Sequence, residues 1–151
     1  MGVFLIDNER VYTYSDLLDS LNLSSLYYPL YKTADIYSYF VNLVQALAAN
    51  KKLVLLDSDL NPSEIDGVDE TLVNVVEPVV HSAYSCMEDV VAALQQSTSE
   101  ITIFTSGTTG QPKKVIHTVS TLTRSVRIGV KYQGQIWAYA YNPTHMAGLQ
   151  V

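Results

Sequence analysis

The chain of 151 residues is long enough for one domain that buries a hydrophobic core without metals or disulfides. Apolar residues make up 48% of the sequence and charged residues only 16%, a composition that argues against intrinsic disorder. The net charge of −6 argues against non-specific binding to nucleic acid or to an anionic membrane, because both need a basic protein surface.

The single cysteine, Cys86, excludes a disulfide framework within the chain and fits a reducing cytoplasm. We expect it to be a structural or surface thiol at the start of a helix rather than a nucleophile. The N-terminal segment has no basic region and too short an apolar run for a signal peptide. No run approaches the roughly 18 apolar residues of a membrane span. The sequence therefore predicts a cytoplasmic protein without a membrane span.

The first 50 residues predict a small hairpin followed by two helices. Residues 3–6 and 11–14 are β-prone and flank the polar sequence DNER, which is typical of two strands joined by a turn. We expect Ser15 to cap a short helix over the sequence DLLDSLN. A second helix over residues 34–50 has one apolar face, made of Ile36, Phe40, Leu43, Val44 and Leu47.

Strands and helices alternate in the middle of the chain. The sequence KKLVLLDSD (51–59) is an apolar run closed by aspartates, which is typical of a buried parallel strand. Residues 57–70 are the most loop-like stretch and mark a candidate boundary between structural sub-units. A helix over MEDVVAALQQ (87–96) then leads into the short strand ITIF (101–104), which stops at a glycine-rich turn.

Beyond this turn the sequence predicts a strand, a helix and a further strand. The sequence KVIHTV (114–119) is β-prone, and QIWAYAY (135–141) alternates like a strand. Between them, a helix that begins near Ser120 directs Leu122 and Val126 inward, with two arginines outward. Such alternation of helices and strands predicts an α/β fold with three layers.

The sequence FTSGTTGQPKK (104–114) combines the features of a phosphate-binding loop at the carboxyl end of a predicted strand, where α/β sheets bind ligands. Its glycines allow the backbone to approach a ligand closely, and its N–H and hydroxyl groups can donate to phosphate oxygens. Basic residues are concentrated late in the chain, at Lys113, Lys114, Arg124, Arg127 and Lys131. The predicted phosphate-binding residues are Thr105, Ser106, Gly107, Thr108, Thr109, Gly110 and Lys113.

The loop is not a P-loop. That pattern needs a glycine directly before the lysine and a serine or threonine directly after it, whereas Pro112 and Lys114 flank Lys113 here. The alternative to a phosphate site is a surface turn rich in threonine and glycine.

The sequence FTSGTTGQPKKV closely resembles the phosphate-loop motif of the adenylate-forming (AMP-binding) superfamily. That superfamily includes acyl- and aryl-CoA synthetases, luciferases and the adenylation domains of non-ribosomal peptide synthetases. The chain departs from the motif at Lys114, where glycine is usual. Two weaker likenesses follow the family order: VYTYSDLLDSLN (11–22) resembles an early TYxEL segment, and YNPTHMAGLQV (141–151) resembles a later PLFHxxGL segment. The resemblance spans nearly the whole chain, and the phosphate loop is its specific part.

This resemblance implies an AMP-forming acid:CoA ligase-like enzyme. Family members react a carboxylate with Mg-ATP at the α-phosphorus and release pyrophosphate, and most then transfer the acyl group to a thiol such as coenzyme A. The loop and Lys113 would hold the β- and γ-phosphates and stabilise charge on the leaving group. His145 and Gly148 match acyl-pocket residues that contact the substrate carboxylate region and leave room for the acyl group. We expect a small non-amino carboxylic acid, because THMA stands where amino-acid-activating members have FDxS.

Alternatives stay open for several residues. If the backbone at position 114 has the positive φ that the usual glycine allows, Lys114 would cost about 1–2 kcal/mol of strain. If φ is ordinary there, Lys114 merely adds a second cation near the phosphates. His145 is alternatively a partly buried histidine that ends a strand. We expect His81 and His117 to be structural. No two histidines have metal-ligand spacing and the lone cysteine adds no ligand set, so we expect no zinc site, and the residues that bind the Mg²⁺ of Mg-ATP are expected outside residues 1–151.

The family motifs that bind adenine, ribose and Mg²⁺ do not occur in residues 1–151, nor does the lysine of the C-terminal lid domain. We therefore expect residues 1–151 to be an N-terminal part of a longer adenylate-forming enzyme, truncated within its AMP-binding domain and inactive alone. The alternatives are a non-catalytic module that binds a nucleotide or phosphate, and an oligomeric scaffold with contacts from the 11 tyrosines. Exposed apolar surface on a truncated sheet would also favour self-association.

Overall fold

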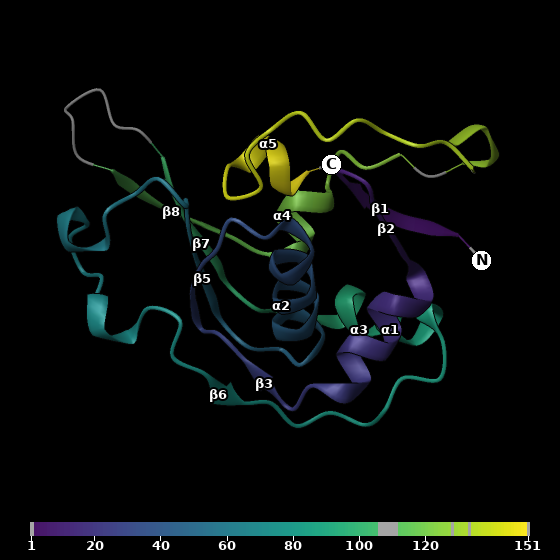
Figure 1. The fold of residues 1–151 in the computed structure, drawn as a ribbon, viewed down its shortest axis with the longest axis horizontal. Helices are drawn as coiled ribbons and strands as arrows, with labels where there is room; N and C mark the ends of the chain where they lie inside the picture. The colour runs from purple at the N-terminus through teal and green to yellow at the C-terminus, as the bar shows by residue number, and fades with distance from the viewer. Residues whose placement is uncertain (1, 106–111, 128, 133, 151) are drawn as a thin grey trace.

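The computed structural model describes residues 2–105, 112–127, 129–132 and 134–150. Its largest sheet has four strands in the order β4-β5-β7-β8 (Figure 1). The strands β4 (Leu30–Lys32), β5 (Leu53–Leu56) and β7 (Ile101–Thr105) are parallel, and β8 (Lys113–His117) runs antiparallel to β7. The mixed arrangement of helices and sheet confirms the predicted α/β class, and β5 is the parallel strand that the sequence predicts.

The α-helices lie on one face of this sheet (Figure 1). Helix α2 (Ile36–Ala48) packs directly on the sheet, and α1 (Tyr14–Leu23) and α3 (Met87–Gln96) pack against the side of α2 that faces away from it. The short helices α4 (Val119–Thr123) and α5 (Met146–Leu149) also join the core beside the sheet. The main core cluster contains Tyr39, Ala46, Leu47, Leu53, Leu55, Ile101, Ile103 and Leu122.

The opposite face of the sheet is covered by an irregular segment. This segment includes two 3₁₀ turns, η1 (Pro62–Glu64) and η2 (Glu70–Leu72), within the stretch that the sequence predicts to be loop-like. Ile65 packs against Leu56 and Phe104, whose side chains alternate along their strands with those that face α2. In the described ranges, α-helices therefore cover only one face of the sheet. The other face is covered by loop structure with 3₁₀ turns, where the predicted three layers would have α-helices.

A β-hairpin precedes α1, as predicted. Strands β1 (Val3–Asp7) and β2 (Arg10–Thr13) pair antiparallel across the turn. The predicted helix cap at Ser15 is wrong, because α1 begins after Thr13. The Thr13 hydroxyl oxygen accepts a hydrogen bond from Asp16 N at 3.2 Å, and the Asp16 carboxylate accepts one from Thr13 N at 2.6 Å. This reciprocal capping box satisfies donors on both sides of the helix start, which a cap at Ser15 would not do.

Helix α2 is buried on more than the single face that the apolar spacing predicts. Its buried polar residues bond to the backbone of the chain segment that enters the sheet. Asn42 accepts from Tyr28 N at 2.7 Å and donates to Tyr28 O at 3.1 Å, while Gln45 Nε2 donates to Ser24 O at 2.7 Å. These hydrogen bonds hold the strands β3 (Leu26–Tyr27) and β4 against α2, and β3 pairs with β6 (Glu77–Pro78) in a small sheet.

The last third of the chain differs from the sequence prediction. Leu122 is buried, as predicted. Helix α4 ends at Thr123, before Val126, and Val126 is exposed rather than directed inward. Residues 135–141 form no strand among the described residues, which include one further 3₁₀ turn, η3 (Val130–Tyr132). Ile136 and Trp137 are 75% and 64% exposed. The alternating pattern of residues 135–141 is typical of a strand, but in the described part of the chain the structure pairs no other strand with them. An unpaired strand would leave its backbone N–H and C=O groups without hydrogen bonds.

Cys86 precedes α3 and is exposed, in agreement with a surface thiol at a helix start. In the ranges that the structure describes, no helix combines the length and the hydropathy needed to cross a membrane.

Candidate functional site

The strands β7 and β8 bring the two ends of the predicted phosphate loop together. Thr105 and Lys113 are cross-strand partners, and Thr105 Oγ1 donates to the carbonyl oxygen of Lys113 at 3.5 Å. The predicted residues Ser106, Gly107, Thr108, Thr109 and Gly110 lie outside the described residues. The described ends put the start of the loop at the carboxyl end of a parallel strand, which is the edge where α/β sheets bind ligands. The exposed side chain of Lys113 supplies positive charge there.

Lys114 lies inside β8, opposite Phe104. Its φ is ordinary, because the described non-glycine residues with positive φ are Asn8, Asn50 and Asn74, so the strained alternative is excluded. The pKa of the Glu100 carboxyl is lowered mainly by its ion pair with Lys52 and further by the charge of Lys114. Since Glu100 precedes β7, the ammonium group of Lys114 acts toward the amino end of β7, away from the loop.

Asp57 lies at the same edge of the sheet, directly after β5. Strands β5 and β7 are parallel neighbours, so Asp57, which follows β5, and Thr105, which ends β7, both lie at the carboxyl ends of their strands. The Asp57 carboxylate accepts a hydrogen bond from Asn142 Nδ2 at 2.6 Å. Its side chain is only 14% exposed, so this carboxylate fixes a segment 85 residues away against the sheet edge.

His145 is positioned by a tight turn and by Asp57. Asn142 Oδ1 accepts hydrogen bonds from the N and Oγ1 atoms of Thr144, at 2.9 and 2.8 Å, and His145 then caps α5. The imidazole Nε2 lies 3.4 Å from Asp57 Oδ2, and the ring is 56% exposed. His145 therefore does not end a strand. Its side chain is accessible and lies at the carboxyl edge, and its contact with Asp57 is made by Nε2 and not by Nδ1.

Gly148 is buried in α5 against the Asn142–Pro143 backbone. A Cβ atom at this position would overlap the Asn142 carbonyl oxygen and lie 2.8 Å from its carbonyl carbon. The space beside Gly148 is thus filled by backbone in this structure, and the glycine permits the close approach that places Asn142 next to Asp57.

Two tyrosine hydroxyl groups donate hydrogen bonds to the backbone of the segment 142–148. Tyr39 OH donates to Pro143 O at 2.6 Å, and Tyr139 OH donates to Gly148 O at 2.8 Å. Burial raises the pKa of both phenols, that of Tyr139 to about 12, so both remain neutral donors at physiological pH. A cavity of about 140 Å³ lies beside Tyr39 and Asn142, which is small compared with the roughly 300–1,000 Å³ of typical ligand pockets.

Other candidate groups lie away from this edge. His81 stacks on Tyr84 with ring centroids 5.0 Å apart, and the buried Nε2 of His117 has no hydrogen-bond partner among the described residues. In the described part of the chain, no three histidine, cysteine or acidic side chains come together as a metal site.

Asp57 and Asn142 are the site residues that the sequence does not single out. Asp57 has a local signal, since it directly follows an apolar strand, but its contact with Asn142 is a tertiary one. Comparisons with models of protein families, with curated proteins and with solved structures found no match.

Proposed function

We propose that this chain binds the triphosphate of Mg-ATP at the 105–113 hairpin, as part of an AMP-forming acid:CoA ligase-like enzyme. In this reaction a substrate carboxylate oxygen attacks the α-phosphorus, the bond to the bridging oxygen breaks, and pyrophosphate leaves. The thiol of coenzyme A then displaces AMP from the acyl-adenylate. The observation that supports this function is the position of the hairpin, whose ends Thr105 and Lys113 lie at the carboxyl end of β7, beside the parallel strand β5 that Asp57 directly follows.

The residues at this edge have separable roles in the proposal. Lys113 and the N–H groups of the loop offset the negative charge that develops on pyrophosphate. His145, with both ring nitrogens protonated, donates a hydrogen bond from Nδ1 to the substrate carboxylate while Nε2 faces Asp57, and Asp57 and Asn142 hold the segment that carries the ring. Mg²⁺ enters with the nucleotide and neutralises its phosphates. No adenine- or ribose-binding motif of the family occurs in residues 1–151, so we assign only triphosphate binding to this chain.

Isothermal titration calorimetry with Mg-ATP, inorganic tripolyphosphate and AMP tests this proposal. ATP and tripolyphosphate should bind, and AMP should bind far more weakly, because the hairpin contacts the β- and γ-phosphates. The variant Lys113→Gln should weaken ATP binding roughly ten- to a hundredfold, since a hydrogen bond from a charged group contributes about 1.5–3 kcal/mol. Lys52→Gln is the matched control, because Lys52 is exposed and pairs with Glu100 at the opposite edge. Equal affinities for AMP and ATP, or an unaffected Lys113→Gln variant, would contradict the proposal.

A second candidate function is an oligomeric scaffold, which the exposure of Ile136 and Trp137 favours. Tripolyphosphate that produces no binding heat, together with a stable oligomer, would select the scaffold. A third outcome would select a non-catalytic nucleotide-binding module. In that case the chain binds tripolyphosphate, but a longer protein that contains it releases no pyrophosphate from ATP when a carboxylate is added.

A further inference from the structure

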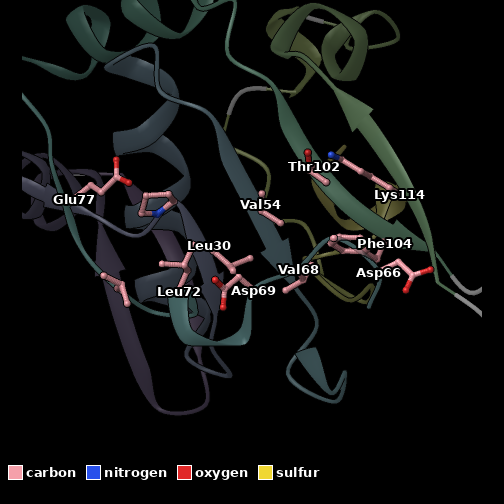
Figure 2. Close-up of a pocket in the computed structure, with 13 residues that line it drawn as sticks. Leu30, Val54, Asp66, Val68, Asp69, Leu72, Glu77, Thr102, Phe104 and Lys114 are labelled. Atoms are coloured by element: carbon pink, nitrogen blue, oxygen red, sulfur yellow. The ribbon is translucent and has the colours of Figure 1, made fainter. Parts of the chain in front are cut away.

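A groove of about 440 Å³ lies on the face of the sheet opposite α2, between the strands and residues 66–77 (Figure 2). Its floor consists of side chains from three neighbouring strands, Leu30, Val54, Thr102 and Phe104. Its volume falls within the range of small-molecule pockets, which are mostly apolar and contain a few polar groups. The groove is separate from the site at the carboxyl edge, since it shares no lining residue with the Asp57–Asn142–His145 contacts.

The wall of the groove is fastened to the sheet. Asn74 N donates to Leu30 O at 2.9 Å, and the Asn74 amide group bonds to both the N and the O of Lys32 at 2.9 Å. Before the wall begins, Leu60 O accepts a hydrogen bond from Lys32 Nζ at 2.7 Å. These contacts act like an extra strand at the edge of β4. They hold the wall at a fixed separation from the floor, so the groove exists before any ligand arrives.

The polar groups of the groove are mainly acidic. Figure 2 shows Asp66, Asp69 and Glu77 along the wall, with Lys114 on the side of β8. None of the three carboxylates forms an ion pair with another described residue. Asp69 uses Oδ1 to cap η2, where it accepts hydrogen bonds from Thr71 N and Oγ1, and its other oxygen is not used by that cap. The lining thus carries two more negative charges than positive ones.

A side chain with a hydroxyl group also lines the floor. Thr102 is only 6% exposed as a residue, and it is one of the residues that line the groove. Its hydroxyl group can donate a hydrogen bond to a ligand in the groove or accept one from it.

We propose that this groove binds a small amphipathic cation, an aromatic or aliphatic body that carries one protonated amine. The body covers Val54 and Phe104, and the ammonium group pairs with one carboxylate of the wall, that of Asp66 or that of Asp69. A carboxylic acid, the substrate class of the proposed reaction, is disfavoured here because the carboxylates of the wall repel it. The groove is therefore a second ligand site, and its existence does not depend on the proposed function.

Amide NMR titrations of the whole chain test the proposal with three probes of similar shape: 2-phenylethylamine, 2-phenylethanol and 3-phenylpropanoate. The amine should shift amides of Val68, Asp69 and Thr102 in a saturable way. It should bind roughly three- to tenfold more tightly than the alcohol, as expected for a few exposed charge contacts, and the carboxylate should bind most weakly. The advantage of the amine should shrink as salt is raised.

A charge variant separates this site from a general effect of the acidic protein. Asp66→Asn together with Asp69→Asn should remove the preference for the amine over the alcohol, and asparagine at position 69 keeps the cap of η2. Glu9→Gln together with Glu88→Gln removes the same charge from residues that do not line the groove, and should keep the preference. Equal binding of amine and alcohol, shifts confined to other regions, the absence of saturable shifts, or equal behaviour of the two double variants would overturn the proposal.

Discussion

Replacing Gly148 with alanine tests whether the turn at the carboxyl edge is packed as the structure shows. Two effects oppose each other. Alanine is intrinsically better than glycine inside a helix by about 1 kcal/mol. The new Cβ, however, overlaps the Asn142 carbonyl oxygen, and a backbone atom cannot move aside as a flexible side chain can. Overpacking of this kind costs about 1–3 kcal/mol, near the upper end for a backbone neighbour.

The expected net result is a loss of about 2 kcal/mol in the free energy of unfolding, since relief of the clash must shift Asn142 and weaken its hydrogen bond to Asp57. For a chain of this size, the melting temperature should fall by about 4–8 °C. Urea unfolding and thermal melts measure both quantities.

Gly129→Ala is the matched control. Gly129 is exposed, has no neighbouring atom within 4 Å of a built Cβ, and does not have a positive φ. This variant should change the free energy of unfolding by less than about 0.5 kcal/mol. Equal stability of the two glycine variants would refute the packing that places Asn142 against α5.

Three further predictions concern other parts of the chain. Asn42→Leu should destabilise the protein by about 2–4 kcal/mol in urea unfolding, because it leaves the partly buried N–H and C=O groups of Tyr28 without their hydrogen bonds to Asn42, whereas the exposed Asn61→Leu should cost less than half as much. The raised pKa of Tyr139 contributes stability that is complete below the unfolded-state pKa of 10.0 and is lost as the pH rises toward about 12, so Tyr139→Phe should flatten this fall, and an unchanged pH profile would argue against the buried phenol. If the chain self-associates through residues 136–137, Trp137→Ser should lower the mass measured by light scattering at high concentration, and Tyr14→Ser, which removes an exposed aromatic ring elsewhere, should not.

Local patterns predicted much of the fold. The hairpin before α1, the helices α2 and α3, and the strands β5 and β7 follow from apolar spacing and turn residues, because each carries its own periodic signal. The stretch 135–141 has the same alternation as a strand and yet forms none, since a strand also needs a partner at an open edge. Strand β4 went unpredicted, because three residues are too few to show a period.

The candidate site was predictable only in part. The composition and order of residues 104–114 predict a phosphate loop, and phosphate binding there stays a prediction. The structure adds that Thr105 and Lys113 pair across strands β7 and β8. The contact of Asp57 with Asn142 joins residues 85 positions apart, so no local pattern could reveal it. The groove on the far face likewise depends on how Asn74 fastens a loop to β4, which is a property of the folded chain.

The most direct test of phosphate binding at the carboxyl edge is a map of amide NMR shifts during titration with Mg-ATP. Saturable shifts should concentrate at Thr105, Lys113 and Asp57 and be reproduced by tripolyphosphate, with little change at Val68 and Asp69 in the groove. Shifts that are absent from these three positions, or that concentrate in the groove, would contradict the account.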